Sequence, residues 1–207
     1  MIHALLAAFI IGLILVSSEM LWSKAHLRGE YARKYVHILA GSFVAFLPFW
    51  LSYNYIALLG GVYVAACILN RYTKVFHAVH GVERLSWGDI YSGVAGIICC
   101  FAEPSPWVFT VAMLHLSLAD GLAAVLGIGF SKKFYYILDH KKSVIGTVAF
   151  MIISVCILVL GRQVGHITQI TLPLFFLIPP VTALLENVSG YGLDNITVPV
   201  LVLILLS

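Results

Sequence analysis

The chain consists of long apolar runs separated by short stretches that hold most of its charged residues. The apolar segments lie at about residues 4–22, 36–53, 55–69, 89–102, 107–129, 144–160, 169–186 and 195–206. Most of them approach the roughly 20 residues that an α-helix needs to cross a bilayer. The fourth and the last are short enough to be tilted, re-entrant or half-buried. The pattern predicts an all-α fold, a polytopic membrane bundle of about seven or eight transmembrane helices.

The composition agrees with this prediction and excludes a soluble domain. Apolar residues make up 61 % of the chain and charged residues 10 %, whereas a soluble domain carries about 25 % charged residues. With 207 residues, we expect a single integral-membrane domain over 1–207. Any active site must then be built from helices and short connections. No nucleic-acid partner is expected, and the oligomeric state is open.

The basic residues predict the orientation of the bundle. Eleven of the twelve Lys and Arg residues fall in the connections 23–35, 70–88 and 130–143, and only Arg162 falls on the opposite face. Because cytoplasmic loops are enriched in Lys and Arg, these three connections are expected in the cytoplasm and the N-terminus outside. We therefore expect a multi-pass membrane protein, in the cell membrane if the source is prokaryotic.

The connection at 74–89 has its own periodicity. Its apolar residues recur every three to four positions, which predicts an interfacial helix on the cytoplasmic surface. His77, His80 and Glu83 share the other side of this helix. Histidines on such a helix are usually solvated, so we favour that interpretation over a metal site.

Polar side chains also occur where the second and fifth segments should be apolar. Arg33 and Lys34 stand at the membrane entry of the second segment, where snorkelling would explain them. His37 lies one turn deeper and needs a polar partner. Asp120 lies within "LSLADGLAAVLGIGF" (116–130), and a carboxylate near the bilayer centre costs roughly 3 kcal/mol. We interpret Asp120 as a functional residue.

Small residues accompany this aspartate. Gly121, Ala124 and Gly127 recur at every third position beside Asp120. Such a face is typical of close helix packing. It would equally form a groove in which a ligand approaches the backbone and a metal meets a carboxylate. Both interpretations are open at this stage.

Two further clusters suit phosphate and metal ligands. Lys141 and Lys142 precede Ser143, a predicted N-cap of the sixth segment, so cations and a helix N-terminus come together there. The stretch "LLENVSGYGLDNITVP" (184–199) has oxygen-bearing side chains without a cation, which suits Mg²⁺ or a ribose. These side chains are Glu186, Asn187, Ser189, Asp194, Asn195 and Thr197.

All four clusters are predicted on the cytoplasmic side of the bundle. Basic groups, carboxylates and a small-residue groove at one face fit an anionic, metal-bound soluble substrate that meets a lipid. The chain has neither the GxxxxGK[ST] loop of P-loop enzymes nor a GxGxxG loop followed by HRD. Neither of these phosphate-binding cradles therefore applies.

Three ordered blocks carry a resemblance to a known family. "RKYVH", then "ADGLAAVLGIGFSKK" followed by "KKSVIGTVAF", and finally "ENVSGYGLDNITVPV" resemble the dolichol kinase and phytol kinase family, which includes CTP-dependent diacylglycerol kinase. The resemblance covers about residues 31–200. It implies an integral-membrane lipid kinase domain that moves the γ-phosphate of CTP onto a lipid hydroxyl with a divalent metal. The expected partners are CTP, Mg²⁺, a lipid alcohol of the polyprenol, dolichol or phytol type, and membrane lipids.

The positions that match the family's blocks follow residue by residue. They are Arg33, Lys34, Asp120, Gly127, Lys142, Ser143, Gly146, Asp194, Asn195 and Pro199. The roles are our own inference: we expect a catalytic set of Asp120, Arg33, Lys34 and His37. Nucleotide and phosphate binding is expected at Lys141, Lys142, Ser143, Gly127, Gly146 and Glu83, with Asp89 as a further candidate. Metal binding is expected at Asp120, Asp194, Asn195 and Glu186.

Three alternatives remain open. A CTP:phosphatidate cytidylyltransferase is similar from Asp120 to Gly146 but ends in a glycine- and histidine-rich acidic signature that "YGLDNITVPV" replaces here. Diacylglycerol is a second possible kinase substrate. A transporter would also use intramembrane Asp and His, although its polar groups should continue across the membrane. The choice of CTP over ATP rests on the resemblance alone.

Overall fold

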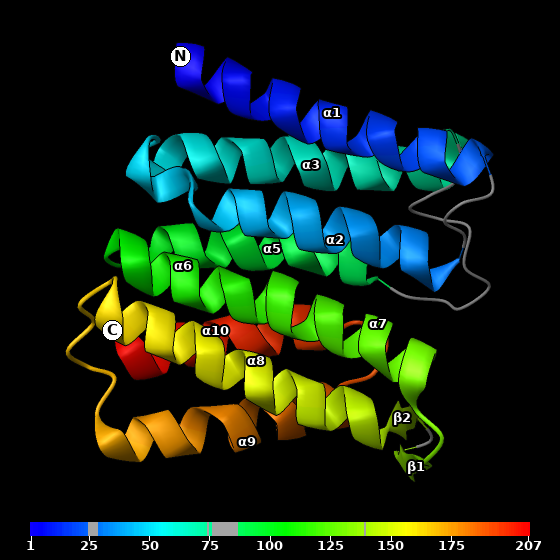
Figure 1. Ribbon diagram of the computed structural model, residues 1–207. Helices are drawn as coiled ribbons and strands as arrows, with labels where there is room; N and C mark the ends of the chain where they lie inside the picture. The colour runs from blue at the N-terminus through cyan, green and yellow to red at the C-terminus, as the bar shows by residue number, and fades with distance from the viewer. Residues whose placement is uncertain (25–28, 74, 76–86, 139) are drawn as a thin grey trace.

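The computed structural model describes residues 1–24, 29–73, 75, 87–138 and 140–207. Its helices lie side by side along one common direction (Figure 1). They are α1 (Ile2–Ser23), α2 (Glu30–Ala45), η1 (Leu47–Phe49), α3 (Tyr53–Thr73), α5 (Gly88–Phe101), α6 (Pro106–Leu114), the π-helical segment η2 (His115–Ala119), α7 (Asp120–Phe130), α8 (Val144–Gln163), α9 (Leu172–Val188) and α10 (Asp194–Leu206). The predicted all-α class is confirmed.

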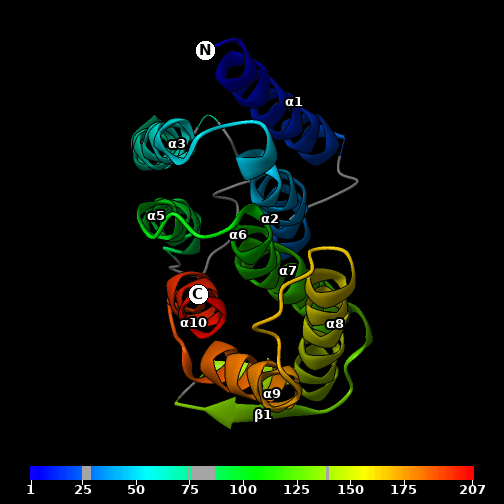
Figure 2. The same ribbon diagram turned by 90° about the vertical axis from the view of Figure 1, so that its left-hand side faces the viewer.

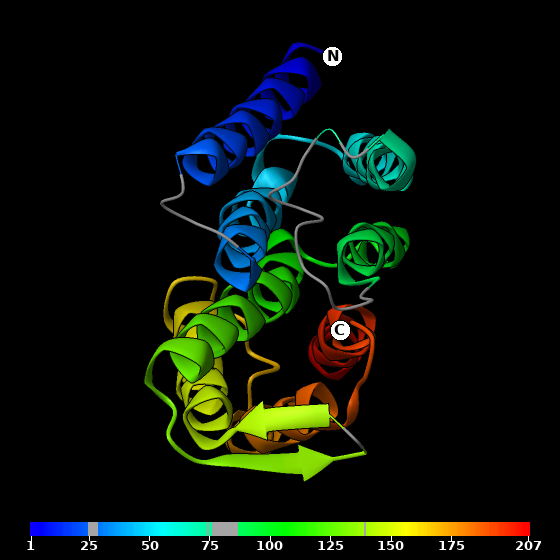
Figure 3. The same cartoon turned by 90° about the vertical axis from the view of Figure 1, so that its right-hand side faces the viewer.

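A short β-hairpin, which the sequence did not predict, interrupts the helices in the described part of the chain. Strands β1 (Phe134–Ile137) and β2 (His140–Ser143) pair antiparallel, with Phe134 opposite Ser143. The hairpin lies across the bundle at the ends of α8 and α9 (Figure 3). Both chain termini lie at the other end of the bundle (Figure 1). The hairpin therefore marks the end at which the predicted site residues gather.

Among the described residues, four helical runs are long and apolar enough to cross a membrane: Ile2–Ser23, Tyr53–Thr73, Pro106–Phe130 and Val144–Gln163. Shorter apolar helices cover Gly88–Phe101, Leu172–Val188 and Asp194–Leu206. Several membrane-crossing helices are thus supported, whereas the count of seven or eight and the outside N-terminus stay predictions.

The second predicted segment, 36–53, has different bounds in the structure. Its helix begins earlier, at Glu30, and ends at Ala45, before Pro48 enters the short helix η1. The preceding Gly29 has φ +57°, a left-handed conformation that glycine adopts without a side-chain penalty. The charged residues of the first turns stay helical because they form ion pairs. The apolar run alone misplaces this helix.

The run through α6, η2 and α7 is the centre of the bundle. In its apolar 18-residue window 67 % of the residues are buried, compared with 11 % in the window of α1. The other helices surround this run (Figure 2). Phe109 and Leu116 on this run belong to the buried core, together with Phe150 of α8 and Ile178 of α9. Asp120 is therefore carried by the most enclosed segment of the bundle.

Helices α7 and α8 approach each other closely through glycines. A Cβ added to Gly127 would collide with Ser143 Oγ and lie 3.4 Å from the Cα of Gly146. Small residues at a membrane-helix crossing permit such contact. The small face beside Asp120 therefore serves packing at Gly127, although this residue also lines the cleft described below.

This close approach gives a testable pair of substitutions. Gly127→Ala should lower the free energy of unfolding by about 1–3 kcal/mol, because the new methyl group must push the two helices apart. Gly129→Ala, two residues along α7, would place its methyl 3.6 Å from the Tyr31 hydroxyl, an ordinary contact. It should leave stability unchanged or raise it by up to about 1 kcal/mol. Thermal unfolding in detergent compares the two, and equal losses would contradict the packing role.

Candidate active site

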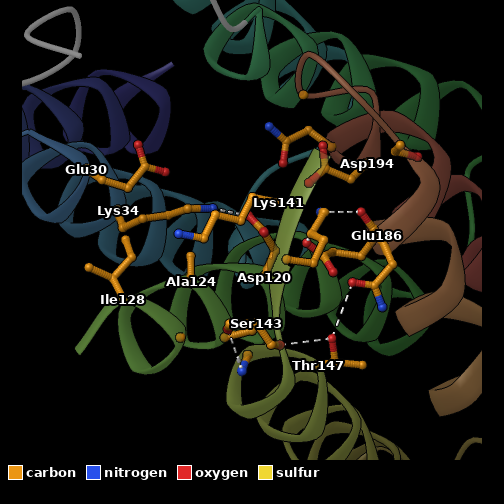
Figure 4. A pocket seen from close by; sticks show the side chains of 18 of the residues that line it. Glu30, Lys34, Asp120, Ala124, Ile128, Lys141, Ser143, Thr147, Glu186 and Asp194 are labelled. Atoms are coloured by element: carbon orange, nitrogen blue, oxygen red, sulfur yellow. Dashed lines mark hydrogen bonds and ion pairs between the residues drawn. The ribbon is translucent and has the colours of Figure 1, made fainter. Parts of the chain in front are cut away.

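A polar cleft opens at the hairpin end of the bundle. Its volume is about 430 Å³, within the range of small-molecule sites. Helices α2, α5, α7, α8, α9 and α10 and the hairpin all contribute side chains (Figure 4). The predicted residues that line it are Arg33, Lys34, Asp120, Gly127, Lys141, Lys142, Ser143, Gly146, Glu186, Asp194 and Asn195. Four clusters that are distant in sequence thus share one cleft.

Asp120 is the most deeply buried carboxylate of this cleft, 6 % exposed. Its Oδ2 accepts a hydrogen bond from Lys34 Nζ, whose side chain is equally buried. His37 Nε2 lies 3.3 Å from the same oxygen. A buried carboxylate needs a partner, and for Asp120 this partner is Lys34 of α2. The two contacts hold the carboxylate in one orientation.

The π-helical turn before Asp120 helps to place His37. His37 Nε2 lies 2.8 Å from the carbonyl oxygen of Leu116, which belongs to η2. Single π-helical turns interrupt the regular hydrogen-bond pattern and recur at functional sites. The Leu116 carbonyl and Asp120 together hold the imidazole beneath the cleft. They are the polar partners that the sequence analysis expected for His37.

Three carboxylates converge in the cleft. Oxygens of Asp120, Glu186 and Asp194 all lie within 4.8 Å of one another. Burial, together with the negative charge of the neighbouring Asp120, raises the pKa of Asp194, at the start of α10, to about 6. Such crowding of negative charge favours a bound cation, and carboxylate oxygens are the ligands that Mg²⁺ prefers. The residues present therefore fit a divalent metal.

Asn195, the fourth predicted metal ligand, ties two elements together. Its Nδ2 donates to the carbonyl oxygen of Gly88 at 2.8 Å, which joins the start of α10 to the start of α5. The Oδ1 of Asn195 is buried and has no hydrogen-bond partner in the part of the chain that the structure describes. This oxygen is therefore the Asn195 atom that could contact a bound ligand or metal.

The basic side chains surround the carboxylates. Lys142 donates to Glu186 Oε1 at 2.5 Å and to the Glu186 carbonyl at 2.6 Å. Lys141 Nζ lies 4.1 Å from the centroid of the Phe134 ring. Arg33 Nε donates to Glu30 Oε2 at 3.1 Å. Cations from α2 and from β2 therefore face one cleft, as phosphate binding requires.

Glu30 is a cleft residue that the sequence interpretation missed. Its ion pair with Arg33 spans one helical turn, the spacing at which opposite charges meet on a helix. Burial raises the pKa of this carboxyl, but the hydrogen bond and charge of Arg33 outweigh burial and lower it. The Glu-x-x-Arg spacing of Glu30 and Arg33 could have indicated this ion pair from the sequence. Glu30 keeps Arg33 oriented along the cleft wall.

A hydrogen-bonded cluster in the cleft wall joins Asn187, which the sequence analysis named, to Tyr135 and Thr147, which it did not. The Tyr135 hydroxyl from β1 contacts Thr147 Oγ1 and donates to Asn187 Oδ1 at 3.0 Å. This contact joins the hairpin to α8 and α9. No local sequence pattern marks it, because its three residues come from three elements.

The predicted N-cap at Ser143 is confirmed. Its Oγ accepts a hydrogen bond from the backbone N–H of Gly146 at 3.0 Å. Ser143→Ala should lower the free energy of unfolding by about 1 kcal/mol, and Ser143→Asn should retain most of the stability because asparagine also caps. Thermal unfolding in detergent measures both. Equal stability of the alanine variant and the parent protein would contradict the cap.

Asp89 and Glu83 were the remaining nucleotide candidates. Asp89 lines the cleft and pairs with Arg71 Nη2 at 2.9 Å, while the Arg71 guanidinium carbon lies 4.2 Å from the centroid of the Trp87 ring. Glu83 lies outside the described residues, as do His77 and His80 and most of the predicted interfacial helix.

The chain is 29 % identical over 201 residues to phytol kinase from a Synechocystis species. The match covers 94 % of this chain and 85 % of that relative. The resemblance to the dolichol kinase and phytol kinase family is confirmed. No family model and no solved structure matches the chain. In this phytol kinase-like chain, the three blocks that carry the resemblance all contribute residues to one cleft.

Proposed function

We propose that the protein is a CTP-dependent, Mg²⁺-requiring kinase that phosphorylates the hydroxyl of a membrane isoprenoid alcohol at the cytoplasmic face. The observation that carries this proposal is the convergence of Asp120, Glu186 and Asp194 within a cleft that also holds Lys34 and Lys142. The relative named phytol kinase supports a phosphotransferase acting on a lipid alcohol. The Lys- and Arg-rich connections at this end of the bundle support a cytoplasmic site.

Phosphoryl transfer asks mainly for positioning and for neutralisation of charge. The side chains of Arg33, Lys141 and Lys142 would bind the triphosphate oxygens. Asp120, Glu186 and Asp194 would hold Mg²⁺, which would supply positive charge to offset the charge of the phosphates. The fixed Asp120 would accept a hydrogen bond from the lipid hydroxyl and orient its oxygen.

The bonds and the proton balance in a single displacement. The lipid oxygen forms a bond to the γ-phosphorus as the bond from that phosphorus to the bridging β–γ oxygen breaks. The hydroxyl proton passes to Asp120 and then to solvent. The products are a lipid monophosphate and CDP. Every group required by this step lies in the cleft or comes with a substrate.

The test uses purified protein with Mg²⁺, a panel of lipid alcohols and phosphatidic acid, and CTP labelled at the α- or the γ-phosphate. We expect label to reach an isoprenoid alcohol from the γ-position only. Label that arrives from the α-position and requires phosphatidic acid would identify a cytidylyltransferase and overturn the proposal. Transfer from ATP in preference to CTP would overturn the choice of nucleotide.

A further inference from the structure

A second cavity lies beside the active-site cleft and is almost wholly apolar. It measures about 90 Å³ and lies between α2 on one side and α3 and α5 on the other, with α1 and α6 contributing to its walls. Leu59, Met113 and Leu116 are typical of its lining. In Figure 2 the pair α3 and α5 stands apart from α2 and α6. The mechanism above makes no use of this cavity.

His37 connects the two sites. Its side chain lines the apolar cavity, and its Nε2 lies 3.3 Å from Asp120 Oδ2. Val44, further along α2, also lines the cavity. At 1.5 Å per residue, His37 and Val44 are separated by about 10 Å along the helix axis. The cavity therefore runs from beneath the catalytic carboxylate into the apolar interior of the bundle.

We infer that this cavity holds the first part of the hydrocarbon chain of a single-chain lipid alcohol, with its hydroxyl at His37 and Asp120. The inference rests on the proposed function and narrows its substrate class. A cavity of about 90 Å³ takes one narrow chain and has no room for two acyl chains side by side. The cavity therefore favours a single-chain alcohol over diacylglycerol, and the rest of the alcohol would lie in the bilayer.

Gly96 of α5 offers a way to fill the cavity. It lines the cavity, and a Cβ added to it would meet only Met113 Cε, at 3.7 Å. A leucine at this position would therefore project into the cavity without displacing backbone. Gly61 of α3 is exposed and has no neighbour within 4 Å of an added Cβ. Gly61→Leu is thus the matched control for Gly96→Leu.

The experiment uses a photoactivatable isoprenoid alcohol that carries a diazirine near its hydroxyl end, without any nucleotide. We expect the label on α2, α3 or α5 of the full-length protein in vesicles, and its loss in Gly96→Leu but not in Gly61→Leu. The Michaelis constant for the alcohol should rise about tenfold or more in Gly96→Leu, the cost of two or three methylene groups that lose their buried site. Ala40→Leu, in the same cavity, should act alike if Gly96→Leu fails to fold.

The outcomes separate this inference from the proposed kinase activity. Label that persists in both leucine variants, or that falls only on lipid-facing surfaces, would overturn the cavity as the chain site even if γ-phosphate is transferred. Efficient phosphorylation of diacylglycerol would overturn it as well. Specific labelling of the cavity without transfer from CTP or ATP would support the cavity and overturn the kinase.

Discussion

Asp120→Asn should reduce phosphoryl transfer from CTP by about 10³-fold. Asparagine keeps the shape of the side chain but removes the charge that, in the proposed mechanism, would orient the lipid hydroxyl and contribute to metal binding. The same change leaves the buried Lys34 without its ionic partner, which should cost about 3 kcal/mol of stability. Transfer of γ-label and thermal unfolding in detergent measure the two effects.

A double variant separates catalysis from folding. Lys34→Met with Asp120→Asn removes both charges, so stability should return towards that of the parent protein while activity stays lost. Glu103→Gln alters an exposed carboxylate after α5 and should change neither quantity. More than a tenth of the parent activity in Asp120→Asn would rule out a direct role for this carboxylate in the transfer.

Asp194→Asn should raise the Mg²⁺ concentration for half-maximal activity by about 100-fold. Asp194 is one of three carboxylates that converge within 4.8 Å, and its replacement removes a charged oxygen from the expected metal site. Activity should recover partly at high Mg²⁺, because Asp120 and Glu186 remain. A Mg²⁺ titration of γ-label transfer checks this result.

The control for this titration is again Glu103→Gln, which should leave the Mg²⁺ dependence unchanged. Asp194→Glu keeps the charge and should lie between the parent protein and the asparagine variant. A parallel loss of maximal activity at every Mg²⁺ concentration, without a shift of the midpoint, would place Asp194 outside the metal site.

The sequence predicted features that depend on neighbours in the chain. The cap at Ser143 is local, because its acceptor and the N–H of Gly146 are three residues apart. Long apolar runs likewise predict membrane helices, because a helix forms all its backbone hydrogen bonds within its own segment. The isolated charge of Asp120 marked a candidate site because a carboxylate in an apolar run needs a partner, wherever in the chain that partner lies.

The partners themselves could not be predicted from spacing. Lys34 and Asp120 are 86 residues apart, and Lys142 and Glu186 are 44 apart. Which helices lie side by side depends on packing of the whole bundle, and the apolar pattern of a membrane helix does not specify its neighbour. The sequence predicted that these residues lie on one face of the membrane. The structure shows which of them form ion pairs.

The hairpin and the π-helical turn were missed for different reasons. The strand Phe134–Ile137 is rich in aromatic residues that favour strands, but it lies in a short charged connection, which is typical of a loop. The segment His115–Ala119 is buried at every residue except Leu118, so one extra residue in its turn leaves no trace in the hydrophobic pattern. The position of His37 depends on that turn.

Two of the three cleft carboxylates have their own counter-ions, because Lys34 pairs with Asp120 and Lys142 pairs with Glu186. We therefore expect the fold to form without a bound metal, unlike that of a zinc finger. In the proposed reaction Lys142 would pair with phosphate oxygens of the nucleotide, and Glu186 would then be free to hold the metal. Substrate binding would thus be an exchange of ion-pair partners within a cleft that is already folded.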